Sequence, residues 1–443
     1  METITDKKIA VMAFPLLFSL LLEHALGFTD TIFLGHVGKV EIGASALAGV
    51  YFLAFLMIAF GFSIGAQIII ARRNGEGRQY RIGSVLVQSC YFMLALAAAL
   101  FVLSKCLAPT ILRSAITSDA IYDATLAYLD WRIYGFFFAF TALMFRAFFV
   151  GITKTRILTV NSLIMVLSNV VLNYGLIFGN FGLPKMGIAG AALGTSIAEL
   201  ISLLFFIIYT KKTVNLRKYG FTHAFTFRPR VLRRIMNLSV WTMVQYFLAV
   251  SVWFIFFISI EQMGEDALAI SNVVRNVASL SYVVIGAFGA TVESLVSNQI
   301  GAGAGHQIRH TCWKTIKLGY VVLIPMLLLI FLFPETVFAL FMKEHSSHLI
   351  EAGIAPLYIM ASASLLSMLS HTVYNCVSGT GNAKAAFFME MATLAVYSGY
   401  LIWLVNGKAS LAMCWTTEYV YYLTMFVLCF GFLQLTKWRG KQV

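Results

Sequence analysis

The sequence predicts an all-α integral membrane protein, and three observations lead to this fold class. First, 60% of the 443 residues are hydrophobic and only 12% are charged, whereas about 25% of the residues in a soluble domain are charged. Second, the apolar residues form long runs. Third, the basic residues gather in short segments between these runs. A soluble enzyme, a disordered chain and a nucleic-acid-binding module are therefore excluded, and the lipid bilayer is an expected partner.

Each predicted transmembrane helix is a run of about 20 mostly apolar residues, the length that crosses about 30 Å of hydrocarbon. Breaking the chain at its clusters of Gly, Pro and charged residues leaves twelve such runs. They cover residues 9–34, 46–71, 82–107, 125–150, 157–178, 188–209, 235–260, 267–296, 311–333, 350–377, 385–405 and 409–435. We therefore expect twelve transmembrane helices.

The basic residues predict the orientation, because cytoplasmic loops carry an excess of Lys and Arg. The net charge is +13, and most basic residues fall on one side of the predicted membrane, together with both ends of the chain. They include Lys437, Arg439 and Lys441 near the C-terminus. The sequence thus predicts a multi-pass protein of the cell inner (plasma) membrane with both termini in the cytoplasm.

The two halves of the chain show a weak internal repeat. In constant order, the aligned segments are residues 61–77 with 287–303, 149–156 with 376–384, and 192–200 with 411–419. Six helices return the chain to its starting side. We therefore expect an N-terminal lobe (residues 1–220) and a C-terminal lobe (residues 221–443) related by a pseudo-two-fold axis along the membrane normal. Secondary transporters use such repeats and bind substrate between them.

Four polar side chains in the first half form a predicted coupling-cation site. Asp30 lies about one turn from the outer end of the first helix, and Asn169 and Asn173 share one face of the fifth helix. Thr195 lies about two turns into the sixth helix, at a similar depth. Hard cations such as Na⁺ prefer oxygen ligands, and a buried carboxylate can also hold a proton. The same residue types form hydrogen bonds between packed helices, and spacing alone does not separate the two interpretations.

Further polar residues of the predicted spans are candidates for lining a substrate cavity. Glu23 lies two turns deeper than Asp30 on nearly the same face, and Glu199 lies one turn deeper than Thr195. Their negative charge is expected to attract a cationic substrate. The other candidates are Gln67, Gln245, His371, Glu293 and Glu418.

We expect structural or interfacial roles for the remaining charged residues within the spans. Asp130 lies near a helix end and close to Arg132 in the sequence, and Glu390 lies toward the cytoplasmic end of its helix. Arg146 and Arg275 are candidate counter-charges for the buried acids. The sequence does not identify their partners.

Several segments together resemble the MATE (multidrug and toxic compound extrusion) transporters of the bacterial NorM/DinF kind. The first helix reads FPLLFSLLLEHALGFTDTIFLGHVG and contains Asp30 in an F-x-D-T setting. The second helix ends IGAQIIIARRNGEG, the fifth-to-sixth passage reads NVVLNYGLIFGNFGLPKMGIAGAALGT, and the tenth helix ends VSGTGNAK. The resemblance covers essentially the whole chain.

The resemblance implies a cation-coupled (Na⁺ or H⁺) multidrug antiporter that exports organic cations and drugs by alternating access. It implies a Na⁺ site at Asp30, Asn169, Asn173 and Thr195, with no cofactor other than the coupling ion. Where some members carry acids on the seventh and tenth helices, this chain has Gln245 and His371. We expect a monomer whose partners are small-molecule organic cations.

Three other functions are weighed against this one. A related superfamily fold could serve a flippase for a lipid-linked oligosaccharide, although twelve helices and an acid-rich interior disfavour it. An enzyme is disfavoured because the close His pairs, HQIRH and HSSH, fall in loops without a supporting acid pattern, and the six scattered Cys show no metal-ligand spacing. A channel differs from an antiporter in that its flux does not saturate or depend on an opposing gradient.

Overall fold

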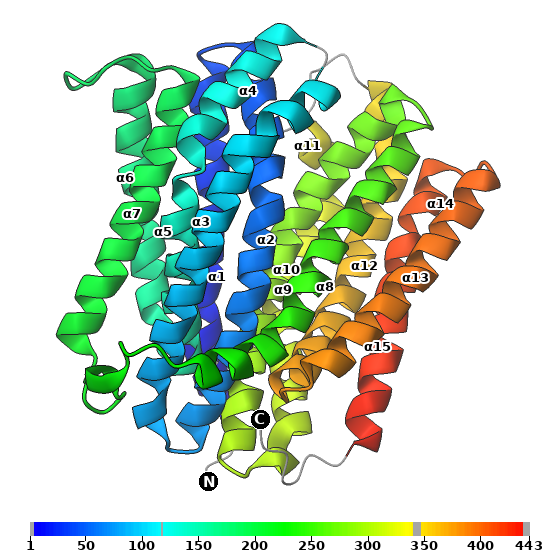
Figure 1. Cartoon of the computed structure of the whole chain (residues 1–443). Coiled ribbons are helices and arrows are strands. Elements are labelled where there is room, and N and C mark those ends of the chain that lie inside the picture. Colours follow the sequence, from blue (N-terminus) through cyan, green and yellow to red (C-terminus); the bar gives the residue numbers. More distant parts are fainter. Residues whose placement is uncertain (1–3, 117, 340–346, 437–443) are drawn as a thin grey trace. The chain divides into compact units, whose positions relative to one another are not determined.

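The computed structural model describes residues 4–116, 118–339 and 347–436. These residues form α-helices and three short 3-10 helices, and no strand occurs among them (Figure 1). The predicted all-α fold class is confirmed. The predicted C-terminal basic residues Lys437, Arg439 and Lys441 lie outside the described residues.

The helices of the first half follow the predicted runs closely. They are α1 (Asp6–Gly35), α2 (Lys39–Gly75), α3 (Ile82–Ala115), α4 (Asp119–Arg132), α5 (Gly135–Gly151), α6 (Arg156–Phe178) and α7 (Ile188–Thr213). Two short 3-10 helices, η1 (Gln79–Arg81) and η2 (Phe221–His223), lie before α3 and after α7.

The second half begins after the linker that contains η2. Its helices are α8 (Pro229–Glu261), α9 (Glu265–Gly301), α10 (Ile308–Leu332), α11 (Pro334–Ala339), α12 (Ser347–Gly379), α13 (Ala383–Asn406), α14 (Leu411–Trp415) and α15 (Thr417–Leu435). The 3-10 helix η3 (Gly305–Gln307) precedes α10.

The described helices make a multi-pass membrane protein. Ten of them are long and apolar enough to cross a bilayer, and α4 with α5 forms an eleventh, bent span. The remaining predicted run lies in α8, whose 33 residues extend about 50 Å at about 1.5 Å per residue, more than the hydrocarbon thickness. Ten of the twelve predicted runs therefore lie in a single helix to within a residue at either end, residues 125–150 form the bent pair α4 and α5, and residues 409–435 cover α14 and α15.

The bend between α4 and α5 departs from the continuous helix that the sequence predicts over residues 125–150. The two helix axes meet at 50°. Gly135 begins α5, and a Cβ at that position would lie 2.1 Å from Nη1 of Arg132. The glycine thus leaves room for a charged side chain at the break in the helix.

The chain divides into two compact units. The N-terminal unit comprises residues 18–243, and the C-terminal unit comprises residues 1–17 and 244–443. The division falls within α1 and within α8, so each unit includes one piece of both helices. The division into lobes at residue 220 stays a prediction.

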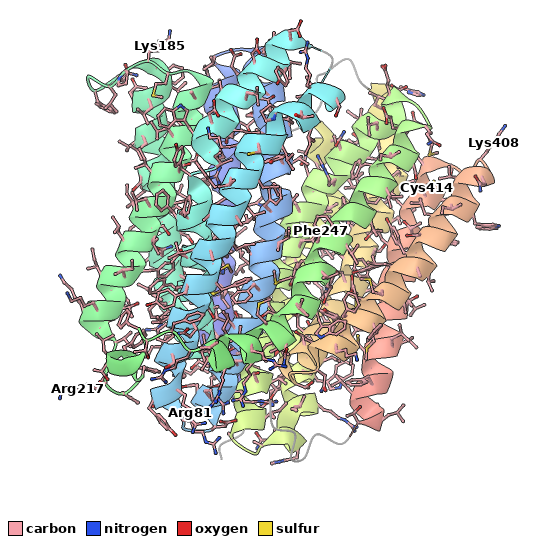
Figure 2. All side chains as sticks on the ribbon, viewed as in Figure 1. Arg81, Lys185, Arg217, Phe247, Lys408 and Cys414 are labelled. Carbon is pink, nitrogen blue, oxygen red and sulfur yellow. The ribbon has the colours of Figure 1, made fainter. Side chains whose placement is uncertain are left out.

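Within the N-terminal unit, α6 packs along α7, and α2 packs against α3, α4 and α5. Phe62, Phe136, Phe140, Phe148 and Phe149 are fully buried in this unit. Figure 2 shows Arg81 and Arg217 at one end of the unit and Lys185 at the other. This arrangement places the linker at the arginine-rich end.

Within the C-terminal unit, the first two turns of α10 contact both described ends of the chain. Lys314 donates to the carbonyl of Ile4 at 3.2 Å and lies 3.4 Å from Asp6. Arg309 donates to the carbonyls of Leu433 and Gln434 at 3.3 and 3.2 Å. The start of α1 and the end of α15 therefore lie at the same end of this unit, as an even number of crossings requires.

Candidate cation and substrate sites

The close packing of α6 on α7 builds the first candidate site. Helix α7 carries Gly190 and Gly194, a G-x-x-x-G pair on one face, and such pairs let two backbones approach closely. A Cβ at Gly190 would lie 2.4 Å from the carbonyl oxygen of Leu176, and one at Gly194 would lie 2.5 Å from Oδ1 of Asn173. The missing side chains therefore bring the polar face of α6 against α7.

Four predicted residues meet at this contact. Asn173 Nδ2 donates to Oδ1 of Asp30 at 2.6 Å and to Oδ1 of Asn169 at 3.1 Å. Asn169 Nδ2 donates to the hydroxyl of Thr195 at 3.0 Å, and that hydroxyl lies 3.2 Å from Oδ2 of Asp30. Asn169 and Asn173 are fully buried and Thr195 is nearly so. The structure thus brings Asp30, Asn169, Asn173 and Thr195 into one closed ring of polar contacts from three helices.

One oxygen of this ring has no hydrogen-bond partner. Oδ1 of Asn173 is buried and unpartnered among the described residues, and an unsatisfied buried acceptor carries a desolvation penalty of about 1–3 kcal/mol. A monovalent cation coordinated by this oxygen and the Asp30 carboxylate would remove that penalty. No cluster of three or more His, Cys, Asp or Glu side chains suited to a metal ion occurs in the described part of the chain. The ring therefore suits a hard monovalent cation held by one carboxylate and neutral oxygens.

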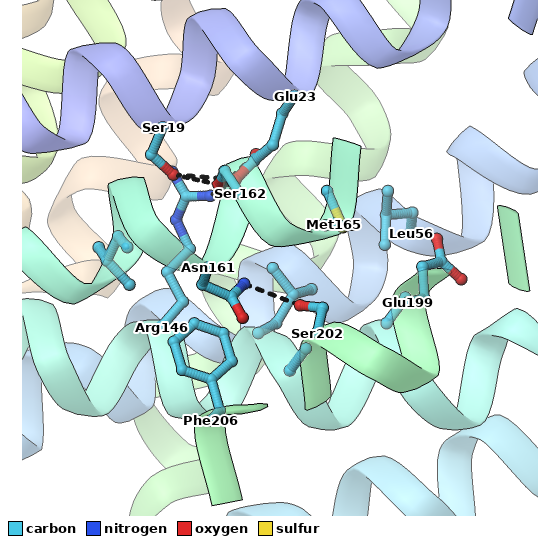
Figure 3. Close-up of a pocket in the computed structure, with 14 residues that line it drawn as sticks. Ser19, Glu23, Leu56, Arg146, Asn161, Ser162, Met165, Glu199, Ser202 and Phe206 are labelled. Atoms are coloured by element: carbon cyan, nitrogen blue, oxygen red, sulfur yellow. Dashed lines mark hydrogen bonds and ion pairs between the residues drawn. The ribbon is translucent and has the colours of Figure 1, made fainter. Parts of the chain in front are cut away.

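The second candidate site is a cavity of about 250 Å³ within the N-terminal unit (Figure 3). Glu23 and Glu199 both line it. Their positions on α1 and α7 place the cavity two turns from Asp30 and one turn from Thr195. The lining residues are Ser19, Glu23, Leu56, Ala139, Ala142, Leu143, Arg146, Leu158, Asn161, Ser162, Met165, Glu199, Ser202 and Phe206.

The Glu23 carboxylate is held by an arginine and two serines. Nη1 of Arg146 donates to its two oxygens at 2.8 and 2.9 Å. The hydroxyls of Ser19 and Ser162 lie 3.1 and 3.0 Å from Oε1 of the same carboxylate. Figure 3 shows the Arg146 side chain reaching from α5 to this group on α1. A third of the Glu23 side chain remains exposed, at 33%, although its carboxylate oxygens are engaged by these contacts.

The Glu199 carboxylate makes a two-pronged ion pair with Arg132. The two pairs of atoms are 2.8 and 2.7 Å apart, and the guanidinium also lies over the ring of Phe52 at 3.6 Å. Asp130, although close to Arg132 in the sequence, pairs with Lys105 at 2.6 Å on the exposed surface. Both acids expected to give the cavity a negative charge are therefore compensated by arginines.

The remaining cavity candidates lie elsewhere. Gln67 is buried on α2 and is absent from the lining of the described cavity. Gln245 on α8 is buried, and its Oε1 has no hydrogen-bond partner among the described residues. Glu293 on α9 is buried and accepts a hydrogen bond from Ser378 at 2.6 Å. Gln245 and Glu293 belong to the C-terminal unit.

Tyrosines surround the other acids of the C-terminal unit. Tyr421 donates to Oε1 of Glu390 at 2.6 Å, and Tyr282 lies 3.5 Å from Oε2 of Glu418. The ring of His371 lies 6.4 Å from that of Tyr421. Among the described residues, neither glutamate has a basic residue within ion-pair distance. The structure thus shows tyrosine neighbours for Glu390, Glu418 and His371, three residues for which the sequence identified no partner.

Arg275, a candidate counter-charge, lies over the ring of Phe257 at 4.9 Å, and no ion pair with an acid is found for it among the described residues. One residue of the cavity wall was not predicted from the sequence. Asn161 donates to Ser202 at 2.7 Å at the cavity wall. The G-A-A-L-G segment of α7 was the one visible signal, because G-x-x-x-G in an apolar helix indicates close helix contact.

Comparison with known proteins identifies the family of the chain. A sequence profile of the MatE family matches residues 15–175 and again residues 242–404. The chain is 24% identical over 400 residues to the probable multidrug resistance protein NorM of Synechocystis sp., covering 87% of this chain and 84% of that protein. It is 26% identical over 296 residues to the multidrug resistance protein NorM of Vibrio cholerae, covering 66% and 64%.

Solved structures share the fold at low sequence identity. A crystal structure of MATE in complex with MaL6 superposes with a TM-score of 0.89 at 17% identity, covering 97% of this chain and 96% of that one. A MOP superfamily transporter from Pyrococcus furiosus, described as having a binding pocket of reverse polarity, gives 0.89 at 17% identity, with 97% of each chain covered. The eukaryotic MATE transporter AtDTX14 gives 0.83 at 19% identity, with 98% and 96% covered. Since the family profile spans most of both halves, the chain belongs to the MatE family.

Proposed function

We propose that the protein exports small organic cations and drugs across the plasma membrane in exchange for Na⁺ that moves inward. The observation that carries this proposal is the ring of Asp30, Asn169, Asn173 and Thr195, in which one buried amide oxygen is left without a partner. The relatives named multidrug resistance proteins support the substrate class.

Exchange requires that the two ligands favour different states of the protein, because a ligand shifts an equilibrium only by its differential affinity. Glu23 and Asp30 lie on the same helix, two turns apart, and Glu199 lies one turn from Thr195. A cation drawn into the ring would reorient the side chains of α1 and α7, and the same two helices line the cavity. Coupling between the ion and the substrate therefore passes through α1 and α7.

A cationic substrate in the cavity competes with an arginine for the carboxylate of Glu23. Glu23 is bound by Arg146, so an organic cation must displace the guanidinium to reach the carboxylate. The unpartnered, buried Oδ1 of Asn161 at the cavity wall is a second acceptor. We infer that substrates with N–H donors beside an aromatic or apolar body bind here in preference to quaternary ammonium ions.

The proposed topology places the arginine-rich end of the N-terminal unit and both termini in the cytoplasm, following the excess of basic residues. One copy of the chain suffices for this function, since the ring and the cavity are each built within one unit.

The test is ethidium efflux from proteoliposomes that contain the purified protein. The wild type should export faster with an opposing Na⁺ gradient than with a K⁺ gradient at the same pH. Asp30→Asn should reduce the Na⁺-dependent rate at least tenfold. Asp130→Asn is the matched control, because it removes the same charge from an exposed pair outside both sites. A wild-type rate in Asp30→Asn would overturn the coupling role, and export that follows pH but not Na⁺ would replace Na⁺ with the proton. Efflux that fails to saturate would indicate a channel.

A further inference from the structure

A second cavity of the N-terminal unit has a different chemistry from the substrate cavity. It measures about 410 Å³ and lies where the end of α2, the 3-10 helix η1 and the first turn of α3 meet the start of α8. Five of its lining residues are arginines, and Tyr80 and Ser84 add hydroxyl groups. The arginines are Arg73, Arg81, Arg228, Arg230 and Arg234. No carboxylate is among the lining residues.

Most of this positive charge has no compensation. Arg73 pairs with Glu76 at 2.8 Å. Arg81, Arg230 and Arg234 have no carboxylate within ion-pair distance in the described part of the chain, and all three are exposed. Guanidinium groups bind phosphate through paired hydrogen bonds. The cavity therefore suits an anion, and a phosphate has enough oxygens to accept from several arginines at once.

The linker that brings these arginines together is fixed to α3. Nε2 of Gln88, a fully buried residue, donates to the carbonyls of Ala224 and Thr226 at 3.2 and 2.9 Å. Oε1 of Gln88 accepts from the backbone N–H of Arg228 at 2.9 Å. The side chain of Arg228 reaches back to the Ser84 hydroxyl at 3.3 Å. The arginine cluster is thus held in place by a buried amide that uses both of its ends.

Two exposed aromatic residues on the linker beside Arg228 indicate that the bound anion has an apolar part. Phe225 and Phe227 are 66% and 64% exposed, although they lie on a linker and not on a spanning helix. The backbone of Phe225 is bound by the hydroxyl of Tyr91 at 2.9 Å. The 36-residue span that begins at Gln79 is about 54 Å long, so about 12 Å projects beyond the hydrocarbon at each end. Gln88, about 14 Å from Gln79, then lies near the boundary of the hydrocarbon, and the linker bound to it lies near the headgroups, where aromatic side chains are enriched.

We propose that this cavity binds the phosphate of an anionic phospholipid from the adjacent leaflet. The phosphodiester lies among Arg81, Arg230 and Arg234, and the acyl chains lie along Phe225 and Phe227. Basic pockets between transmembrane helices on the cytoplasmic side bind anionic headgroups. Only the choice of leaflet rests on the proposed topology, and binding itself is independent of transport.

The test is lipid-dependent thermal stabilisation of the purified full chain in detergent. The probes are dioctanoyl phosphatidylglycerol, dioctanoyl phosphatidylcholine and inorganic phosphate. Phosphatidylglycerol should bind at least tenfold more tightly than either of the other two. The triple substitution Arg81→Gln, Arg230→Gln and Arg234→Gln should weaken phosphatidylglycerol at least tenfold, and lysine at the same positions should restore part of the affinity.

The matched control removes three exposed charges of the same end at Lys212, Arg217 and Lys218, none of which lines the cavity. It should change phosphatidylglycerol affinity less than threefold. Equal affinities for the two lipids, or an equal loss in the control, would overturn the site. Phosphate that binds as tightly as the lipid would overturn the lipid as its ligand. Efflux in the absence of anionic lipid would leave the proposed function intact even where this site fails.

Discussion

Replacing Glu199 with Gln tests the buried ion pair at the bend between α4 and α5. The side chains of Glu199 and Arg132 are only 13% and 10% exposed, so Glu199→Gln leaves a buried guanidinium without its counter-charge. Breaking a buried pair from one side costs about 3–5 kcal/mol. At about 2–4 °C per kcal/mol for a unit of 150–250 residues, the expected fall in Tm is about 6–20 °C.

The partner substitution separates the ion pair from its surroundings. Arg132→Met also removes the contact with the Phe52 ring, which is worth about 2 kcal/mol when desolvated, so its Tm should fall further than that of Glu199→Gln. The double variant has no unpaired charge and should recover much of the loss. Tm is measured by heating the detergent-solubilised protein and following its size-exclusion peak. Asp130→Asn, which breaks an exposed pair worth about 0–1 kcal/mol, is the control. If Glu199→Gln has the same Tm as this control, or if the fall in Tm of the double variant equals the sum of the two single falls, the buried ion pair does not stabilise the unit.

Two further predictions concern packing. Gly194→Ala places a Cβ 2.5 Å from Oδ1 of Asn173, and overpacking of this kind costs about 1–3 kcal/mol. Na⁺-dependent efflux should therefore fall at least tenfold. The control is Gly49→Ala, whose new Cβ meets nothing within 4 Å and which should behave as the wild type. Equal activity of the two variants would show that the α6–α7 contact does not position the ring. Gln88→Ala removes three hydrogen bonds to the linker, each worth about 1 kcal/mol, so limited proteolysis should cut the linker faster than in the wild type. An unchanged cleavage rate would mean that other contacts hold the linker.

The helices were predictable from the sequence because each apolar run carries its own signal. The depth of Asp30, Asn173 and Thr195 was also predictable, since helical rise converts residue number into height. What the sequence could not supply was the partner of each charge. Arg132 lies two residues from Asp130, but residues two apart on a helix do not face each other. Arg132 instead forms its ion pair with Glu199, which lies on α7.

Local sequence also failed where a helix breaks. Residues 125–150 carry one continuous apolar signal, and the 50° bend depends on Gly135 making room for a buried ion pair. The pairing of Glu23 with Arg146 also depends on tertiary structure, because it needs a side chain of α5 to reach α1. Glu23 and Glu199 pair with arginines, whereas Glu390 and Glu418 contact tyrosines, so the partner of each buried acid is a tertiary property.

The most direct measurement follows both ligands in the same proteoliposomes. Vesicles loaded with ethidium are given ²²Na⁺ outside, and Na⁺ uptake is recorded together with dye release. The account predicts that ethidium stimulates Na⁺ entry by the wild type and by Asp130→Asn, and that Asp30→Asn abolishes this stimulation. Dye-stimulated Na⁺ entry that persists in Asp30→Asn at the wild-type rate would contradict the assignment of the ion to this ring.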